Sequence, residues 1–177
     1  MEFKDLIEAR RSVRKYAASE ISEAEVEAIV GEALNAPSWK NTEVTRYYAA
    51  VSAEAKGRLR DEALPSFNVA STANAAALAA VTFRKGESGY MGTAAANELG
   101  EMWGAYDCGL ASAYFVLAAK NHGWDSLILG IRDAEKIKVI MGIPCDETLT
   151  AVIALGKAAG AAAKPPRKPV GEVVKVS

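Results

Sequence analysis

The longest helical pattern in this chain runs from about residue 97 to residue 121 and is mostly apolar. At helical spacing its larger side chains share one face, which comprises Tyr106, Leu110, Ala113 and Leu117. Beside that face lies a strip of mostly small side chains, comprising Gly109, Ala113 and Val116. A helix that is apolar on most sides is normally buried, and small side chains let a second helix approach closely. The pattern therefore predicts a buried helix, capped by Gly123 and packed against another helix.

A second helix is marked by signals at both of its ends. Ser22 and Glu25 have the spacing of a capping box, and Ile21 and Val26 have that of a hydrophobic staple. The expected buried stripe comprises Val26, Ile29, Val30, Ala33 and Leu34. Pro37 cannot continue this helix, so we expect a polar loop to follow it.

Four short β-rich segments lie among the helices without the regular strand and helix alternation of a doubly wound fold. These segments are residues 46–51, 76–83, 126–131 and 148–156. Shorter helical patterns begin near Phe3 and cover residues 55–64 and 133–142. The chain has 177 residues, half of them hydrophobic and without an internal repeat, which suits one domain. We predict an α+β domain over residues 1–163, followed by a tail, residues 164–177, that carries no core pattern.

Charge and cysteine content exclude several classes of partner. The chain has 21 basic and 22 acidic residues, and this balance provides no global positive field to attract nucleic acid. Its two cysteines, Cys108 and Cys145, are far apart and fit neither a disulfide framework nor a zinc site. The longest apolar run, residues 75–83, is too short to span a bilayer, and no signal-peptide pattern opens the chain. We therefore expect a soluble, cytoplasmic protein that binds neither nucleic acid nor membrane.

The common catalytic motifs are absent from this sequence. It contains no GxGxxG after a strand, no GxxxxGK[ST], no HExxH and no GxSxG. The single histidine, His122, lies beside the expected end of the long helix, where a surface role is the simpler interpretation. Glu101 and Asp107 are six positions apart and point to different helix faces, so they do not form an acid–base pair. Asp107 is better explained as the acceptor for a buried backbone N–H or a tyrosine hydroxyl.

Three polar segments remain that could bind a ligand: residues 10–15, 37–41 and 164–168. The first gathers three arginines and a lysine around Ser12, and arginines four apart on a helix repel each other unless an anion lies between them. The third segment is also basic, and the second offers mainly uncharged hydrogen-bonding groups. Each segment alone is commonly a solvated helix end, a helix stop or a linker. Together they favour a phosphorylated small molecule with a polar, planar remainder.

In this order the segments resemble the flavin-dependent nitroreductase family over nearly the whole chain. The matching pieces are "RRSVRKY", "APSWKNTE", Asn68 in "LPSFN", "LILGIRDAEKIKVIMGIP", "VIALG" and "KPPRKPVGEVV". The resemblance implies an α+β fold around a mainly antiparallel sheet, flanked by helices. It also implies FMN bound at the interface of an intertwined homodimer, with the tail reaching the partner subunit, and reduction of acceptors by NAD(P)H.

The same resemblance assigns roles to residues of this chain. Arg10, Arg11 and Ser12 would hold the ribityl phosphate, and Arg14 the pyrimidine side of the flavin. The partner subunit would supply Pro37, Ser38 and Asn41. The remaining expected contacts are Asn68 at the polar edge of the ring, the backbone N–H groups of Leu129 and Gly130 near N5, and Arg167 with Lys164 or Lys168 on the phosphate. No side chain is assigned to catalysis, and no metal is implied.

The expected function is transfer of a hydride from NAD(P)H through the flavin to an organic acceptor, with ping-pong kinetics. The alternative is a non-catalytic FMN-binding or redox-sensing dimer that uses the same basic segments. Nitroaromatics, quinones and flavins all remain open as acceptors, and either NADH or NADPH as reductant. Glu43 and Thr45 stand where the family commonly has glutamine and an aromatic residue, and residues 84–92 are the one candidate for a lid.

Overall fold

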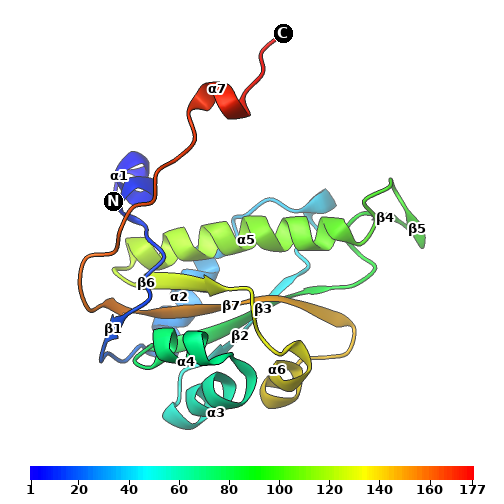
Figure 1. The fold of residues 1–177 in the computed structure, drawn as a ribbon. Coiled ribbons are helices and arrows are strands. Elements are labelled where there is room, and N and C mark those ends of the chain that lie inside the picture. The colour runs from blue at the N-terminus through cyan, green and yellow to red at the C-terminus, as the bar shows by residue number, and fades with distance from the viewer.

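A computed structural model describes all residues of the chain, 1–177. Fifteen elements follow one another along it (Figure 1): α1 Phe3–Ala9, β1 Tyr16–Ala17, α2 Glu23–Ala33, the 3₁₀ helix η1 Trp39–Asn41, β2 Thr45–Ala50, α3 Ala53–Ala63, α4 Ser66–Thr72, β3 Ala77–Arg84, β4 Tyr90–Met91, β5 Ala94–Ala95, α5 Met102–Asn121, β6 Asp125–Leu129, α6 Ala134–Met141, β7 Glu147–Ala158 and α7 Val170–Val173. The four expected strands and the long helix are all present.

The central sheet is antiparallel throughout its named strands. Strand β7 pairs with β3 in register Ala79 to Ile153, and β3 pairs on its other side with β2. Strands β6 and β1 pair with β7, Asp125 lying opposite Gly156 and Tyr16 opposite Ala158. These pairings confirm the α+β class, and they make the long strand β7 the centre of the sheet.

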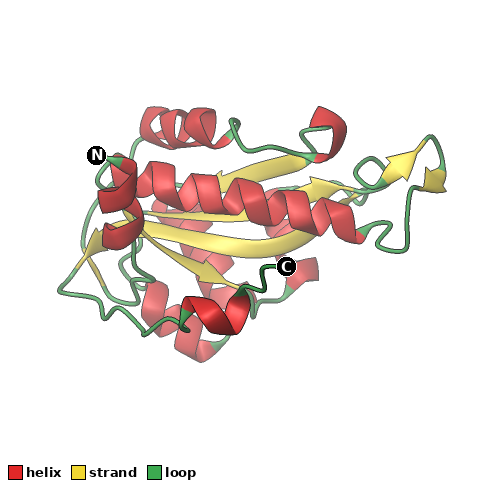
Figure 2. Cartoon of the chain, turned by 90° about the horizontal axis from the view of Figure 1, so that it is seen from above, coloured by secondary structure: helices red, strands yellow, loops and turns green.

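Helices cover both faces of this sheet, and each face has its own core (Figures 1 and 2). On one face α2 and α5 pack through Ile29 and Phe115, both fully buried, against Ile153 of β7. On the other face α3 and α6 contribute the equally buried Leu59 and Ile137. The two apolar faces explain why "AALAAVTF" reads as a continuous apolar run rather than an alternating one.

The helix ends follow the local signals in the sequence, with one exception. The Ser22 hydroxyl accepts from the Glu25 N–H, and the Glu25 carboxylate accepts from the Ser22 N–H, which completes the capping box. Gly142 adopts a left-handed φ of 64° at the end of α6. The expectation that Leu34 is buried is wrong, because α2 ends at Ala33 and Leu34, as its C-cap, is 59% exposed.

The long helix α5 differs from the expectation at its start and on one face. It begins at Met102, because Asn97 instead closes a turn by accepting from the Leu99 N–H. Its buried face carries Cys108 and Phe115, whereas the face expected to be buried is open, with Tyr106 59% exposed. The helical spacing correctly predicted that these side chains share an apolar face. The rest of the chain, however, leaves this face of α5 exposed.

The tail leaves the body of the molecule, and every residue from 164 to 177 is exposed. It contains only the single-turn helix α7 and extends beyond α1 (Figure 1). The chain thus offers the tail no core of its own, as the sequence indicated. No helix in the structure is long and apolar enough to cross a lipid bilayer.

Candidate functional site

The arginine segment, residues 10–15, lies at one end of strand β6. Arg10 is the C-cap of α1, and beyond it the Val13 N–H donates to the Ser126 carbonyl over 2.9 Å, beside a parallel bridge between Ser12 and Ser126. This pairing fixes the backbone of the segment along the strand. The cluster was expected at the end of a short amphipathic helix or just past it, and it begins at the C-cap of α1, although no residue of that helix is buried within this chain.

The cationic groups of this segment are not neutralised within the chain. The Arg11 guanidinium donates to the Arg10 carbonyl over 2.7 Å, and the Arg14 guanidinium donates to the Ser12 carbonyl over 3.4 Å. None of Arg10, Arg11 and Arg14 forms an ion pair with a carboxylate. The backbone carbonyls accept some of the hydrogen bonds that the guanidinium groups can donate, but they carry no negative charge. The segment is therefore suited to binding an anion.

The stretch that leads into the tail forms the second wall of this site. The Ala159 N–H donates to the Lys15 carbonyl over 2.9 Å, and residues 159–163 with Pro165 face residues 12–15 across a hollow of about 470 Å³. Lys164 reaches α1, where it pairs with Glu8 and lowers the pKa of that carboxyl through their hydrogen bond. The structure thus brings Lys164 near the arginines.

The other two tail cations that were expected at the site, Arg167 and Lys168, lie elsewhere. Arg167 and Lys168 are exposed, and neither makes a hydrogen bond or an ion pair with the rest of the chain. Their side chains are therefore unengaged within one subunit.

A second group of expected residues lies at the opposite end of β6. Leu129 is the buried last residue of the strand, and the exposed Gly130 follows it. The buried Asn68 on α4 donates from its amide to the Ile131 carbonyl over 2.9 Å, which places it beside this strand end. From Ser126 to Gly130 the strand advances about 13 Å, at about 3.3 Å per residue. One strand therefore separates the arginine segment from a second polar end, which holds Asn68 and, just beyond it, Arg132, whose guanidinium donates to the Leu149 carbonyl over 2.6 Å. This spacing suits a long ligand with a phosphate at the arginine segment.

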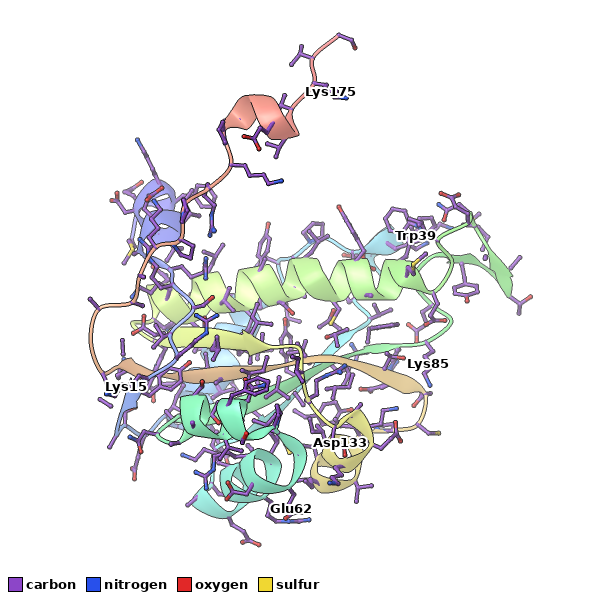
Figure 3. All side chains as sticks on the ribbon, in the orientation of Figure 1. Lys15, Trp39, Glu62, Lys85, Asp133 and Lys175 are labelled. Atoms are coloured by element: carbon purple, nitrogen blue, oxygen red, sulfur yellow. The ribbon has the colours of Figure 1, made fainter.

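The third expected group, Pro37, Ser38 and Asn41, lies far from the arginine segment within one chain. Figure 3 shows Trp39 and Lys15 at opposite ends of the molecule, with α5 between them. The Ser38 hydroxyl accepts from the Glu43 N–H over 3.0 Å, and the Asn41 amide donates to the Glu43 carboxylate over 2.8 Å. A single chain therefore carries two separate parts of the expected site.

The loop that contains Ser38 and Asn41 is surrounded by further contacts, two of which involve Trp103 and Ser88, residues that were not singled out in the sequence. Trp39 packs on Trp103 with ring centroids 4.8 Å apart, and Trp103 meets the edge of Tyr106 at 5.3 Å. Asp107 accepts from the Trp39 N–H, which confirms the backbone partner, one of the two alternatives expected for it. It also accepts from the Ser88 hydroxyl, which was not expected. The clue in the sequence was a lone acidic residue amid small and apolar ones on an apolar helix.

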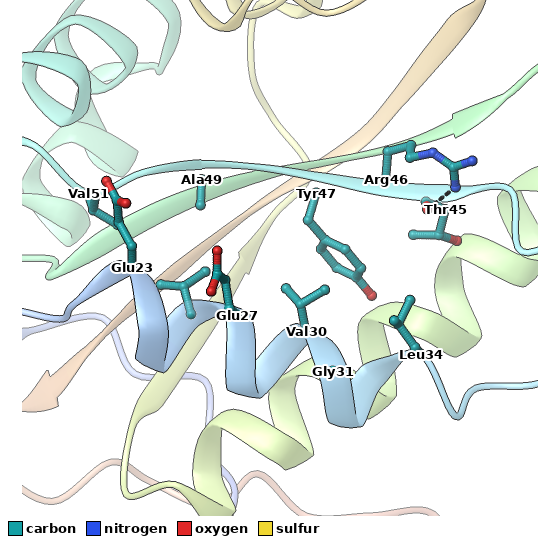
Figure 4. A pocket seen from close by; sticks show the side chains of 11 residues that line it. Glu23, Glu27, Val30, Gly31, Leu34, Thr45, Arg46, Tyr47, Ala49 and Val51 are labelled. Atoms are coloured by element: carbon teal, nitrogen blue, oxygen red, sulfur yellow. Dashed lines mark hydrogen bonds between the residues drawn. The ribbon is translucent and has the colours of Figure 1, made fainter.

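Two further hollows border the sheet. One, of about 640 Å³, lies between α5 and the start of β7 and is lined by Cys108, Thr150 and Ile128 among others. The other, of about 520 Å³, lies between α2 and the edge strand β2 (Figure 4). Figure 4 shows Glu23 and Glu27 on the wall of the second hollow, where they would repel a phosphate. These two carboxylates make the second hollow less suited to a phosphate than the arginine segment, although Arg46 also lines it.

Cys108 and His122, two side chains with reactive chemistry, are both engaged within the chain. Burial raises the pKa of the Cys108 thiol, which keeps it protonated, and its sulfur lies 3.0 Å from the Thr150 hydroxyl. His122 is engaged at the surface with the Glu32 carboxylate at 2.8 Å. No group of three or more His, Cys, Asp or Glu side chains is placed to hold a metal ion.

Comparison with known proteins agrees with this architecture. The model of the Nitroreductase family matches residues 7–157. A curated relative, "Putative NAD(P)H nitroreductase YdgI" of Bacillus subtilis (strain 168), is 28% identical over 188 residues, covering 89% of each chain.

Solved structures share the fold over nearly the full length of the chain. A protein of Exiguobacterium sibiricum, solved in complex with FMN, has 22% identity and a TM-score of 0.87, covering 100% of this chain and 98% of its own. A nitroreductase family protein of Streptococcus pneumoniae has 17% identity and a TM-score of 0.86, covering 99% of this chain and 100% of its own. With the family model covering most of the sequence, the chain belongs to the nitroreductase family.

Proposed function

We propose that this protein is an NAD(P)H-dependent FMN oxidoreductase that passes electrons to an organic acceptor, such as a nitroaromatic compound, a quinone or a flavin. The observation that carries this proposal is the arrangement along β6. Three arginines without carboxylate partners lie at one end of the strand, and Asn68 with the open backbone at Gly130 lies at the other. The relative YdgI is named for the same nicotinamide-dependent activity, which supports the choice of reductant.

The arginine segment would hold the phosphate of FMN. Arg10, Arg11 and Ser12 would bind its oxygens, and Arg14 would turn toward the pyrimidine side of the ring. Each hydrogen bond to a charged group contributes about 1.5–3 kcal/mol, so two or three arginines suffice without a glycine-rich loop or a metal. The site ends at one phosphate, which favours FMN over FAD.

The complete site would require two copies of the chain. Pro37, Ser38 and Asn41 flank Trp39, which lies at the other end of the molecule from Lys15 in Figure 3, and this separation supports a role for them at the cofactor of the other subunit. The uncovered face of α5, with Gly109 and Ala113 exposed, offers a surface on which a second α5 could pack closely. In such a dimer the tail would reach the partner, where Arg167 and either Lys164 or Lys168 would close on the phosphate.

The chemistry would belong to the cofactor, because FMN, when bound, accepts a hydride and passes electrons onward. The protein would orient the ring and stabilise developing negative charge at N5 through backbone N–H groups of Leu129 or Gly130. Asn68 would hold the polar edge of the ring. No side chain would act as the essential acid, base or nucleophile.

Kinetics and spectroscopy together test this function. If nicotinamide and acceptor bind the same face in turn, double-reciprocal plots at several acceptor concentrations should be parallel lines. NADH or NADPH, added without oxygen, should remove the yellow absorbance of the purified protein, and an acceptor should restore it. A yellow protein that neither nucleotide bleaches would contradict the proposed activity and support a non-catalytic FMN-binding or redox-sensing role.

A further inference from the structure

Asp107 is a buried carboxylate for which the proposed function has no role. It lies on α5, is 2% exposed, and forms no ion pair. Its Oδ2 accepts from the Trp39 N–H over 3.0 Å and from the Ser88 hydroxyl over 2.6 Å. Burying a carboxylate without a cation is costly, and an apolar residue would fill the same space at lower cost. The carboxylate therefore contributes specific geometry rather than fold stability.

The loop that Asp107 contacts has an unusual backbone. Lys40, Asn41 and Glu43 have positive φ values of 48°, 55° and 49°. Left-handed backbone at non-glycine residues costs on the order of 1–3 kcal/mol each and persists where surrounding contacts impose it. This backbone conformation therefore depends on contacts within the loop and on contacts with the rest of the chain.

Two side-chain hydrogen bonds join residues of the loop to one another: the Asn41 amide donates to the Glu43 carboxylate, and the Glu43 N–H donates to the Ser38 hydroxyl. Just beyond the loop, the Arg46 guanidinium donates to the Glu43 carbonyl over 2.6 Å. The N–H of Trp39 is the only backbone N–H of residues 37–43 that donates to a side chain outside the loop, and that side chain is Asp107. Trp39 lies directly between Ser38 and the left-handed residues. Asp107 therefore anchors the loop at the point where its unusual backbone begins.

We infer that Asp107 is a positioning residue for the cofactor site of the partner subunit. By fixing the backbone at Trp39 it sets the direction in which Ser38 and Asn41 face the partner's flavin. The Ser88 hydroxyl, which is equally buried, donates to the same carboxylate oxygen and helps to orient it. This inference rests on the proposed function, in which residues 37–41 serve the FMN bound by the other subunit.

Substitutions at this anchor should change FMN affinity in a graded way. Asp107→Ala should raise the FMN dissociation constant by at least about tenfold, because the loop loses a charge-assisted hydrogen bond. Asp107→Asn keeps an acceptor for the Trp39 N–H and should restore most of the affinity, and Ser88→Ala should cause a smaller loss. Phe115→Leu is the matched control, because Phe115 is buried on the same helix, eight residues beyond Asp107, and its ring stacks on Tyr47 with centroids 5.0 Å apart. It should lower the melting temperature and leave FMN affinity unchanged.

A mixed dimer tests whether Asp107 acts across the interface. One subunit carries Asp107→Ala and the other carries Arg14→Ala, with different tags for purification. The Asp107→Ala subunit keeps an intact arginine segment, and its partner keeps an intact loop, so one site per dimer should bind FMN with unmutated affinity. Two weakened sites, or an Asp107→Ala homodimer with unchanged affinity, would overturn the inference. An unmutated protein that binds no added FMN would instead overturn the proposed function, and the inference with it.

Discussion

At the scale of single residues, the charge of Arg14 is central to the proposed site. Its guanidinium contacts only the Ser12 carbonyl, at 3.4 Å, so its charge is available to a ligand. Arg14→Ala should weaken FMN binding by about 1–3 kcal/mol through loss of charge-assisted contacts. Titration of the apoprotein with FMN, followed by flavin fluorescence, measures this difference.

The matched control for Arg14 is Arg58→Ala. Arg58 forms an exposed ion pair with Glu62 on α3, away from the arginine segment. An exposed pair of this kind contributes little to stability, so the variant should bind FMN as the unmutated protein does. If Arg14→Ala and Arg58→Ala bind FMN with equal affinity, the arginine segment is not part of the FMN site.

Three side chains with reactive chemistry should prove dispensable. Cys108 is buried with its thiol pKa raised, Cys145 is exposed, and His122 is held by Glu32. Cys108→Ala, Cys145→Ser and His122→Gln should each leave turnover within about tenfold, which corresponds to roughly 1.4 kcal/mol in barrier. Steady-state rates with saturating FMN test this. A drop of several orders of magnitude with flavin still bound would reveal a catalytic side chain.

At the scale of elements, α5 packs against the sheet at Gly104. A Cβ at this position would overlap the ring of Phe83, so Gly104→Ala should destabilise the protein by about 1–3 kcal/mol. A Cβ at Gly31 on α2 would meet no atom of the chain within 4 Å. Thermal melts followed by circular dichroism should show a lower midpoint for Gly104→Ala and no lower midpoint for Gly31→Ala. An unchanged midpoint for Gly104→Ala would contradict this packing.

The elements also show which features a sequence can predict. Caps such as Ser22 with Glu25 and Gly142 were predictable, because their partners lie within a few residues. The exposure of Tyr106 was not, since helical periodicity identifies an apolar face without identifying what covers it.

The same distinction applies to the candidate site: some of its features could be predicted from the sequence, and others could not. The arginine segment stood out because its charges are adjacent in sequence. The hydrogen bond from Trp39 to Asp107 joins residues 68 positions apart, so only the folded chain could reveal it. Likewise, the separation of Ser38 and Asn41 from the arginines depends on the tertiary arrangement and not on any local pattern.

At the scale of the whole molecule, the exposed tail is the clearest sign of a second subunit. Truncation after Gly160 should weaken the dimer and flavin binding together, because the tail would supply both interface and phosphate contacts. Truncation after Val174 is the control, since it keeps Lys164, Arg167 and Lys168. Size-exclusion chromatography with flavin absorbance reports both properties. If the Gly160 truncation elutes as a flavin-loaded dimer, the tail does not serve the partner.

The visible absorbance spectrum of the purified protein, followed by release and mass identification of any bound cofactor, tests the central claim most directly. The arrangement of Arg10, Arg11 and Arg14 at one end of β6 and Asn68 at the other predicts a yellow protein that releases FMN and not FAD. Protein that purifies without colour should become yellow when FMN is added and excess cofactor is removed. A colourless protein that retains no added FMN would contradict the account.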